Sequence, residues 1–280
     1  MVDISDPVTN TTLSYYIEPR LHTYLHEKVK IDLSRKDKDY VMIIDGYEGS
    51  GKSTFAQQIG KYVDPTLDLS RICMTANEFK MAIINARPNQ CVIYDEAVTG
   101  MTSSDSITRV GKLLKSMMMQ MRQKNLFVII IMPTIFEFGK YAVLGRAKSF
   151  FHVYESKGKR GYFAGYNRRD MKKLYLYGKK TYSYKVRSRF TGRFYGKYVV
   201  NEEEYRKKKA DALFLIEGED GEGEKGNKYM EFYHKLVIAL RKELDLSEVK
   251  TAEKLKAYGI QVSAANIGEI TRKYAVTPTT

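Results

Sequence analysis

The stretch IIDGYEGSGKST, residues 43–54, runs from a short apolar segment through three glycines into a lysine and two hydroxyl side chains. Residues 40–44 are apolar and bounded by charge, which predicts a buried strand, while apolar side chains recur at helical spacing in 53–63. Between them lies the pattern G-x-x-x-x-G-K-S. Glycines let backbone N–H groups approach an anion closely, and a helix start adds its dipole. The stretch therefore predicts a loop that binds a chain of phosphates.

The side chains at the end of this loop have separate expected roles. Lys52 is expected to reach the β and γ phosphates of ATP, and Ser53 to ligate Mg²⁺. The alternative, a glycine-rich turn without a ligand, does not explain the strand and helix on either side of the loop. We assign nucleotide binding to Gly46, Gly49, Ser50, Gly51, Lys52, Ser53 and Thr54.

A second constellation follows in CVIYDEAVTG, residues 91–100, where an apolar strand ends in Asp95 and Glu96. With this strand beside the phosphate-loop strand, Asp95 is expected to hold Mg²⁺ at the carboxyl edge of a parallel sheet. Glu96 is expected to orient and deprotonate the attacking water. Apolar strands also end in Asp-Glu by chance, so the assignment depends on the phosphate loop upstream.

The next elements extend the same architecture. An apolar stripe at helical spacing predicts a helix over 107–121, and NLFVIIIMPT, residues 125–134, is a continuous apolar strand of the kind buried in parallel sheets. A last strand is expected over 149–154. Thr134 is either a sensor near the γ-phosphate or part of a strand-ending turn. The fold class is α/β, with a parallel sheet flanked by helices.

These motifs, together with MRQKN at 121–125 and GRAKSFFHVY at 145–154, resemble the additional-strand catalytic-glutamate P-loop ATPases over roughly 40–155. Within that division the chain is most similar to the zonular occludens toxin-like, FtsK and HerA-like and viral genome-packaging ATPases. The resemblance implies a RecA-like core, a homo-oligomeric ring or filament and an arginine finger from a neighbour. Arg122 and Arg146 are the candidates, each with a plain structural arginine as the alternative. Many of these motors have Gln at the end of the strand where this chain has Pro133-Thr134.

The formal charge of +14 is concentrated in one segment. Residues 156–200 hold 14 Lys and Arg against the single acid Asp170, whereas the rest of the chain holds 33 against 32. The segment also contains 11 of the 34 Phe and Tyr residues. Because a solvated face usually mixes both signs, this asymmetry indicates a polyanionic partner.

Alternating apolar and polar residues in 174–177 and 182–187 predict a small antiparallel β-meander in this segment. Lys and Arg neutralise phosphates, while aromatic faces either stack on bases or pack as a small core. The alternative is a sheet with a merely solvated face. We assign nucleic-acid contact, with double-stranded DNA expected, to Arg168, Arg169, Lys172, Lys173, Lys185, Arg187, Arg189 and Arg193.

The remaining boundaries follow from composition. An N-terminal helical segment (1–38) precedes the ATPase core (39–155) and the basic meander (156–200), and a helix (201–216), an acidic Gly-rich linker (217–227) and a three-helix domain (228–280) follow. The last domain is expected to be either a helix-turn-helix, with Arg272 and Lys273 facing a groove, or a protein-docking bundle.

Several classes of protein are disfavoured. The longest apolar run is far too short to span a membrane, and the N-terminus lacks the pattern of a signal peptide, so we expect a cytoplasmic protein (host cytoplasm if viral) without a membrane partner. Cys73 and Cys91 are expected to be buried thiols. A nuclease needs several acids, and the basic segment has one. The sequence predicts an ATP-hydrolysing DNA motor for translocation or packaging; a nucleotide-switched DNA-binding adaptor is the alternative, and a small-molecule kinase ranks third.

Overall fold

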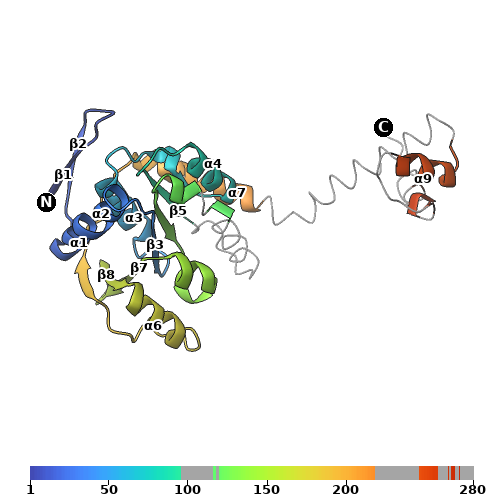
Figure 1. Ribbon diagram of the computed structural model, residues 1–280. Helices are drawn as coiled ribbons and strands as arrows, with labels where there is room; N and C mark the ends of the chain where they lie inside the picture. Colours follow the sequence, from blue (N-terminus) through green and yellow to red (C-terminus); the bar gives the residue numbers. More distant parts are fainter. Residues whose placement is uncertain are drawn as a thin grey trace. The chain divides into compact units, whose positions relative to one another are not determined.

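The computed structural model describes residues 1–95, 116, 117, 120–217, 246–257, 264, 266–268 and 271. The chain divides into two compact units, Met1–Leu213 and Phe214–Thr280, and each is described by itself (Figure 1). None of the described helices combines the length and apolarity that crossing a membrane requires.

A seven-stranded sheet forms the centre of the first unit, with strand order β4-β5-β6-β3-β7-β8-β9. Strands β4 to β7 in this order pair in parallel, and β7-β8 and β8-β9 pair antiparallel. The strands are β3 (Tyr40–Gly46), β4 (Ile72–Cys73), β5 (Cys91–Asp95), β6 (Phe127–Ile131), β7 (Ser149–Ser156), β8 (Lys159–Asn167) and β9 (Phe190–Arg193). The mostly parallel α/β sheet expected from the apolar runs is confirmed.

One neighbour relation differs from the sequence-based expectation. Strand β6 lies between β3 and β5, so the strand that ends in Asp95 is not directly beside the phosphate-loop strand. The register nevertheless aligns Ile44 of β3 and Asp95 of β5 with the same residue, Ile131. The carboxyl ends of β3 and β5 therefore share one edge of the sheet, which is the condition that the metal assignment needs.

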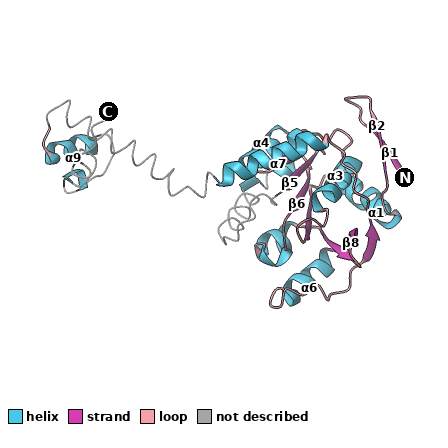
Figure 2. Ribbon diagram, turned by 180° about the vertical axis from the view of Figure 1, so that it is seen from behind, coloured by secondary structure: helices cyan, strands magenta, loops and turns pink. Residues whose placement is uncertain are grey.

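Helices cover both faces of the sheet, as the continuous apolar strands require. One face packs against α4 (Ala76–Asn85), the short helical turns η4 (Ile135–Glu137) and η5 (Tyr141–Arg146), and α6 (Arg168–Gly178). Helix α3 (Lys52–Val63) packs on β3, β5 and β6. Its Phe55 stacks on Phe163 of β8, with ring centroids 4.8 Å apart, and also contacts Phe151 of β7. The sheet is thereby buried from two sides (Figure 2).

The sequence predicted a helical N-terminal segment, but only part of this segment is helical. It opens with a hairpin of β1 (Val2–Ser5) and β2 (Thr12–Tyr15), in which Val2 pairs with Tyr15. Helical structure then runs through α1 (Pro19–Tyr24), the π-helical turn η1 (Leu25–Lys30) and α2 (Ile31–Ser34). The hairpin forms because Ile4 and Tyr15 are buried and Tyr15 Oη donates to the Gln58 carbonyl of α3 at 2.7 Å.

The predicted β-meander is wrong for residues 168–178, which form helix α6. Asn167 caps this helix by accepting a hydrogen bond from the Asp170 N–H at 2.9 Å. Buried side chains then recur at helical spacing, at Met171, Leu174 and Tyr175, whereas Leu176 is half exposed. This stretch has a short alternating pattern that is typical of a strand. It forms a helix because the residues that contact the core recur every three to four positions.

The strands on either side of α6 belong to the central sheet. Strand β8 pairs along β7 from Ser149 to Ser156, and β9 pairs with β8. The basic segment therefore continues the central sheet, and its Phe163, Phe190 and Phe194 pack on Phe55 and one another. Those aromatic side chains serve the core.

Helix α7 (Glu202–Glu217) follows, capped by Asn201, whose side chain accepts from the Glu203 and Glu204 N–H groups. The boundary between the two units falls within α7. In the second unit the structure describes α9 (Glu248–Ala257), whose Leu255 is buried together with Ile267. The predicted linker 217–227 lies outside the described residues except for Glu217, and so do most of the residues assigned to a helix-turn-helix.

Candidate functional site

The loop after β3 has the backbone geometry that its glycines permit. Gly46, Gly49 and Gly51 have φ values of 144°, 73° and 98°, all in the region that disfavours side chains. A Cβ at Gly46 would lie 2.0 Å from the Val153 carbonyl oxygen of β7. Only glycine fits at Gly46, because both the conformation and the close backbone approach exclude a side chain there.

Helix α3 starts directly from this loop. Gly51 is its N-cap residue, and no described side chain caps its first turn, so its N–H groups face the loop. Lys52 is buried, and its Nζ donates to the carbonyl oxygens of Gly46 at 2.6 Å and Tyr47 at 2.8 Å. Burial lowers the pKa of this ammonium, although Asp95 and Asp45 act in the opposite direction. The lysine is therefore held inside the curve of the loop.

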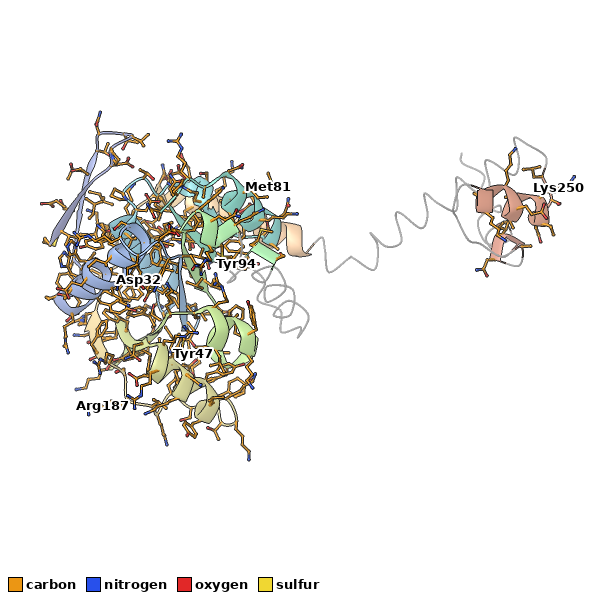
Figure 3. All side chains as sticks on the ribbon, in the orientation of Figure 1. Asp32, Tyr47, Met81, Tyr94, Arg187 and Lys250 are labelled. Atoms are coloured by element: carbon orange, nitrogen blue, oxygen red, sulfur yellow. The ribbon has the colours of Figure 1, made fainter. Side chains whose placement is uncertain are left out.

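The loop fits a phosphate chain on its own atoms. Ser50 Oγ is buried and has no hydrogen-bond partner among the described residues, which leaves a polar atom facing the loop unsatisfied. A Cβ at Gly49 would lie 3.7 Å from the Arg160 guanidinium of β8, so a cation lies beside the loop as well. Tyr47 is 79% exposed at the outer side of the loop (Figure 3).

Asp95 lies at the end of β5 with none of its surface exposed. Its Oδ2 accepts a hydrogen bond from Tyr205 Oη of α7 at 2.6 Å, and Lys209 Nζ lies 3.9 Å away. Tyr205 thus binds one of the two residues that the sequence assigned to Mg²⁺, and Ser53, the other, acts to lower the pKa of the same hydroxyl. Burial, followed by the Asp95 charge, raises the pKa of the Tyr205 hydroxyl, so it remains a proton donor.

A second buried carboxylate precedes the loop. Asp45 Oδ1 lies 2.7 Å from His152 Nδ1 of β7, while Oδ2 accepts from the Ile135 N–H at 2.7 Å and from Tyr184 Oη at 2.6 Å. The His152 and Tyr184 rings stack with centroids 3.8 Å apart. Burial and the Asp45 charge raise the pKa of Tyr184. This cluster links β3, β7 and the segment after α6 immediately beside the phosphate loop.

Thr134 belongs to the edge of that cluster. Its Oγ1 accepts a weak hydrogen bond from the Phe136 N–H at 3.3 Å, as the cap of η4, and lies 3.0 Å from Tyr184 Oη. The strand-ending turn is therefore present, and a sensor role for the same hydroxyl stays a prediction.

The other predicted catalytic residues lie in different settings. Glu96 lies outside the described residues. Arg122 is exposed near the end of the helix before β6. Arg146 forms an ion pair with Asp39, which directly precedes β3 and so lies at the opposite end of that strand from the phosphate loop. This pair gives Arg146 a structural role, and the finger role stays a prediction for both arginines.

The residues assigned to nucleic acid that the structure describes are all exposed. Four come from one face of α6, on the side opposite its buried residues, and four from the segment that leads through β9. They are Arg168, Arg169, Lys172 and Lys173, and Lys185, Arg187, Arg189 and Arg193. Figure 3 shows Arg187 pointing away from the body of the unit. Arg272 and Lys273 lie outside the described residues.

Sequence reasoning missed Asp45, His152, Tyr184, Tyr205 and Lys209. Asp45 stands inside the quoted stretch, and a carboxylate directly before the first loop glycine was an available signal. The other residues are far from their partners in sequence; Tyr205 and Asp95 are separated by 110 positions. No pattern within a short stretch of sequence predicts a contact between residues so far apart.

A mostly parallel sheet flanked by helices, with this loop between β3 and α3, fits the RecA-like class of P-loop fold. No protein-family model matches the chain, and no curated protein does. Among solved structures, the N-terminal domain of zonular occludens toxin from Neisseria meningitidis is similar at 11% identity, with 60% of this chain and 98% of that chain covered and a TM-score of 0.32. At that score the similarity carries no argument about this chain.

Proposed function

We propose that the chain binds ATP with Mg²⁺ at residues 46–53 and hydrolyses it. The observation that carries the proposal is the loop itself: three glycines at positive φ, the unsatisfied Ser50 hydroxyl and the buried Lys52, all at the start of α3. A concave backbone, a free hydroxyl and an ammonium at a helix start are together the features that a phosphate chain needs. A glycine-rich turn without a ligand accounts for the positive φ values but not for the unsatisfied hydroxyl beside a buried lysine.

The side chains around the loop have distinct tasks in this proposal. Lys52 exchanges its two loop carbonyls for the β and γ phosphates, and Ser53 and Asp95 hold the metal ion. The ion, when bound, neutralises charge on the phosphates and fixes their orientation. Glu96, directly after Asp95, orients and deprotonates the attacking water. Asp45, fixed by His152 and Tyr184, holds the end of β3 in place.

We further propose that nucleotide turnover acts on DNA. The exposed basic side chains of α6 and the β9 segment supply the phosphate contacts, and the working form is a homo-oligomeric ring that translocates or packages viral or mobile-element DNA in the cytoplasm. Support for this step comes from charge and exposure: 13 net positive charges gather in residues 156–200, which continue the sheet that carries the nucleotide loop.

One observation favours a second candidate, a nucleotide-switched DNA-binding adaptor. The assigned metal ligand Asp95 already accepts a hydrogen bond from Tyr205 of α7, and Lys209 of the same helix lies 3.9 Å from it. A site covered in this way fits slow basal turnover and control of assembly better than rapid cycling. In the adaptor, ATP governs DNA binding, and no mechanical work is done.

The test is steady-state ATP hydrolysis with and without double-stranded and single-stranded DNA. Lys52→Ala is expected to lower turnover at least about 10²-fold, since it removes a charged donor aimed at the phosphates. Lys80→Ala, an exposed lysine on α4, serves as the matched control and should leave turnover unchanged. Glu96→Gln should bind ATP without hydrolysing it.

The outcomes separate the candidates. Strong stimulation by one form of DNA supports a motor and identifies the polymer on which it acts. DNA binding with slow, unstimulated turnover supports the adaptor. Parental turnover in Lys52→Ala rules out the nucleotide site.

A further inference from the structure

The side of the site that faces β5 is covered by a helix from the end of the first unit. Helix α7 begins at Glu202, and in its first turn Tyr205 is 2% exposed. Both figures place α7 beside α4 and near the end of β5 (Figures 1 and 2). The buried tyrosine is therefore directed inward, toward Asp95, while the charged residues around it on α7 are exposed or half-buried.

The contacts of α7 converge on the oxygens assigned to the metal. Tyr205 Oη donates to Asp95 Oδ2 at 2.6 Å. One turn further on, Lys209 Nζ lies 3.9 Å from the same Asp95 oxygen and is half-buried. A proton donor and an ammonium thus both face this carboxylate.

The helix is held in this place by a separate anchor. Lys208 Nζ donates to the carbonyl oxygens of Leu69 at 3.2 Å and Ile72 at 2.7 Å, and it lies 3.2 Å from Glu78 Oε2 of α4. These contacts lie beside β4, away from the phosphate loop. The position of α7 is therefore fixed by the fold as well as by the Tyr205 contact.

We propose that α7 is a gate on the metal side of the nucleotide site, in which Tyr205 and Lys209 occupy the place of Mg²⁺ and must leave for the ion to bind. This inference rests on the proposed function and deepens it. Mg²⁺ requires a near-octahedral shell of oxygens at about 2.0–2.1 Å, and it keeps several waters. A phenol bonded to Asp95 Oδ2 occupies the oxygen that the ion needs, and the Lys209 charge beside the same oxygen repels the ion.

The proposed gate also connects the metal site to the part of the chain that follows α7. Residues 214–280 form the second unit, and α7 is the segment through which the chain reaches them. Release of Tyr205 frees the first turn of α7, while Lys208 keeps the helix beside β4, so that occupancy of the metal site changes the start of the segment leading to the C-terminal unit. Metal-free nucleotide, which does not need the Asp95 oxygen, leaves the gate closed.

The first readout is hydrogen–deuterium exchange of the full chain, followed in peptides from residues 202–213. Exchange is compared for the chain alone, with ADP and EDTA, and with ADP and MgCl₂. We expect faster exchange in these peptides with ADP and MgCl₂ only. Unchanged or slower exchange under that condition overturns the gate.

The second readout is the Mg²⁺ concentration that half-saturates binding of a fluorescent N-methylanthraniloyl-ADP. Tyr205→Phe removes the hydroxyl and keeps the ring, and Lys209→Met removes the charge; each is expected to lower that concentration about five- to tenfold. Tyr198→Phe, whose ring packs 5.5 Å from that of Tyr205, and Lys207→Met, exposed on the same helix, are the matched controls and should stay within about twofold.

The outcomes distinguish the gate from the function it rests on. If the parent binds the fluorescent ADP but Tyr205→Phe and Lys209→Met need as much Mg²⁺ as the parent or more, the gate is wrong and nucleotide binding stands. If the parent chain binds no nucleotide, both fail. If Tyr205→Phe does not fold, Lys209→Met decides, because its half-buried side chain contributes little to the core.

Discussion

Single residues of the glycine-rich loop are fixed by close contacts, some within the loop and some from distant parts of the chain. Gly46 is fixed by its φ and by the Val153 carbonyl oxygen, and Lys52 by two carbonyl oxygens of the loop. Asp45 is satisfied by three groups from β7, η4 and the segment after α6. A buried carboxylate beside a phosphate site needs such donors, because an unpaired charge there is strongly unfavourable.

Another buried pair ties the N-terminal hairpin to the core. Lys61 Nζ of α3 donates to Asp6 Oδ2 at 2.7 Å, and Asp6 Oδ1 accepts from the Val8 N–H at 2.8 Å. Burial raises the pKa of the Asp6 carboxyl, but the hydrogen bonds and charge of Lys61 outweigh it, and the pKa is lowered from 3.8 overall. The pair therefore stabilises the fold above that pH.

Asp6→Asn tests this pair by its pH dependence. The substitution leaves the Lys61 ammonium buried without its counter-charge, and we expect a loss of about 3 kcal/mol in the free energy of unfolding at pH 7. Because the folded pKa is lowered, the contribution is complete above pH 3.8 and is lost as pH falls through the folded value. Urea unfolding at pH 7 and at pH 3 measures it.

The exposed Asp3, on the same hairpin, gives the control. Asp3→Asn should change the free energy of unfolding by less than about 1 kcal/mol at either pH. A loss in Asp6→Asn that is as large at pH 3 as at pH 7 would show that shape, and not charge, is what matters at this position.

At the scale of elements, α6 shows how a helix replaces predicted strands. Its buried face contacts η4, and the chain then turns back directly after the helix, with the Thr181 and Ser183 N–H groups both donating to the Gly178 carbonyl at 3.1 Å. A Cβ at Gly178 would lie 2.4 Å from the Ser183 carbonyl oxygen and 2.7 Å from the Phe136 ring. This glycine allows the return of the segment that carries Tyr184.

Gly178→Ala is therefore expected to destabilise the first unit by about 2–3 kcal/mol, since the new methyl group meets a backbone oxygen and a buried ring. Thermal unfolding of the purified variant measures it. Gly139→Ala is the matched control, because a Cβ there has nothing within 4 Å, and its unfolding temperature should stay close to that of the parent. Equal stability of the two variants would show that a methyl group at position 178 does not clash with the Ser183 carbonyl and the Phe136 ring.

At the scale of the whole first unit, charge and nucleotide site share one sheet. Strands β3 and β7 hold the loop, and β8, β9 and α6 carry the basic side chains. Arg160 and Phe194 lie next to the loop glycines, so the two regions are in contact. A nucleic acid on this surface would therefore lie on the same sheet as the loop that we propose binds the nucleotide.

Neutralising Arg187, Arg189 and Arg193 to Gln tests that surface. If each contacts a DNA phosphate, affinity falls and the slope of log affinity against log salt decreases by up to about 2.7, at roughly 0.9 per contact. Fluorescence anisotropy with duplex DNA over a salt series measures both. Arg35, Lys80 and Arg87, which are exposed outside the basic segment, make the charge-matched control triple. The same affinity and slope in both triple variants would mean that the basic face is only solvated.

The sequence by itself determined the features that are written locally. The loop is a contiguous pattern, and the strands that became β3, β5 and β6 are apolar runs up to their carboxyl ends, of the kind that a sheet buried on both faces requires. The buried state of Cys73 and Cys91 followed from their apolar neighbours in the sequence. In each case the residues that predict the feature lie within one short segment of the chain.

Only the tertiary structure decided where segments of ambiguous pattern went and which distant side chains met. Residues 168–178 became a helix because a core lay on one side of them, and β6 came to lie between β3 and β5. The Asp45 cluster and the contact of Tyr205 with Asp95 join positions about a hundred residues apart. Such contacts depend on strand order and helix docking, and neither is encoded in the spacing of nearby residues.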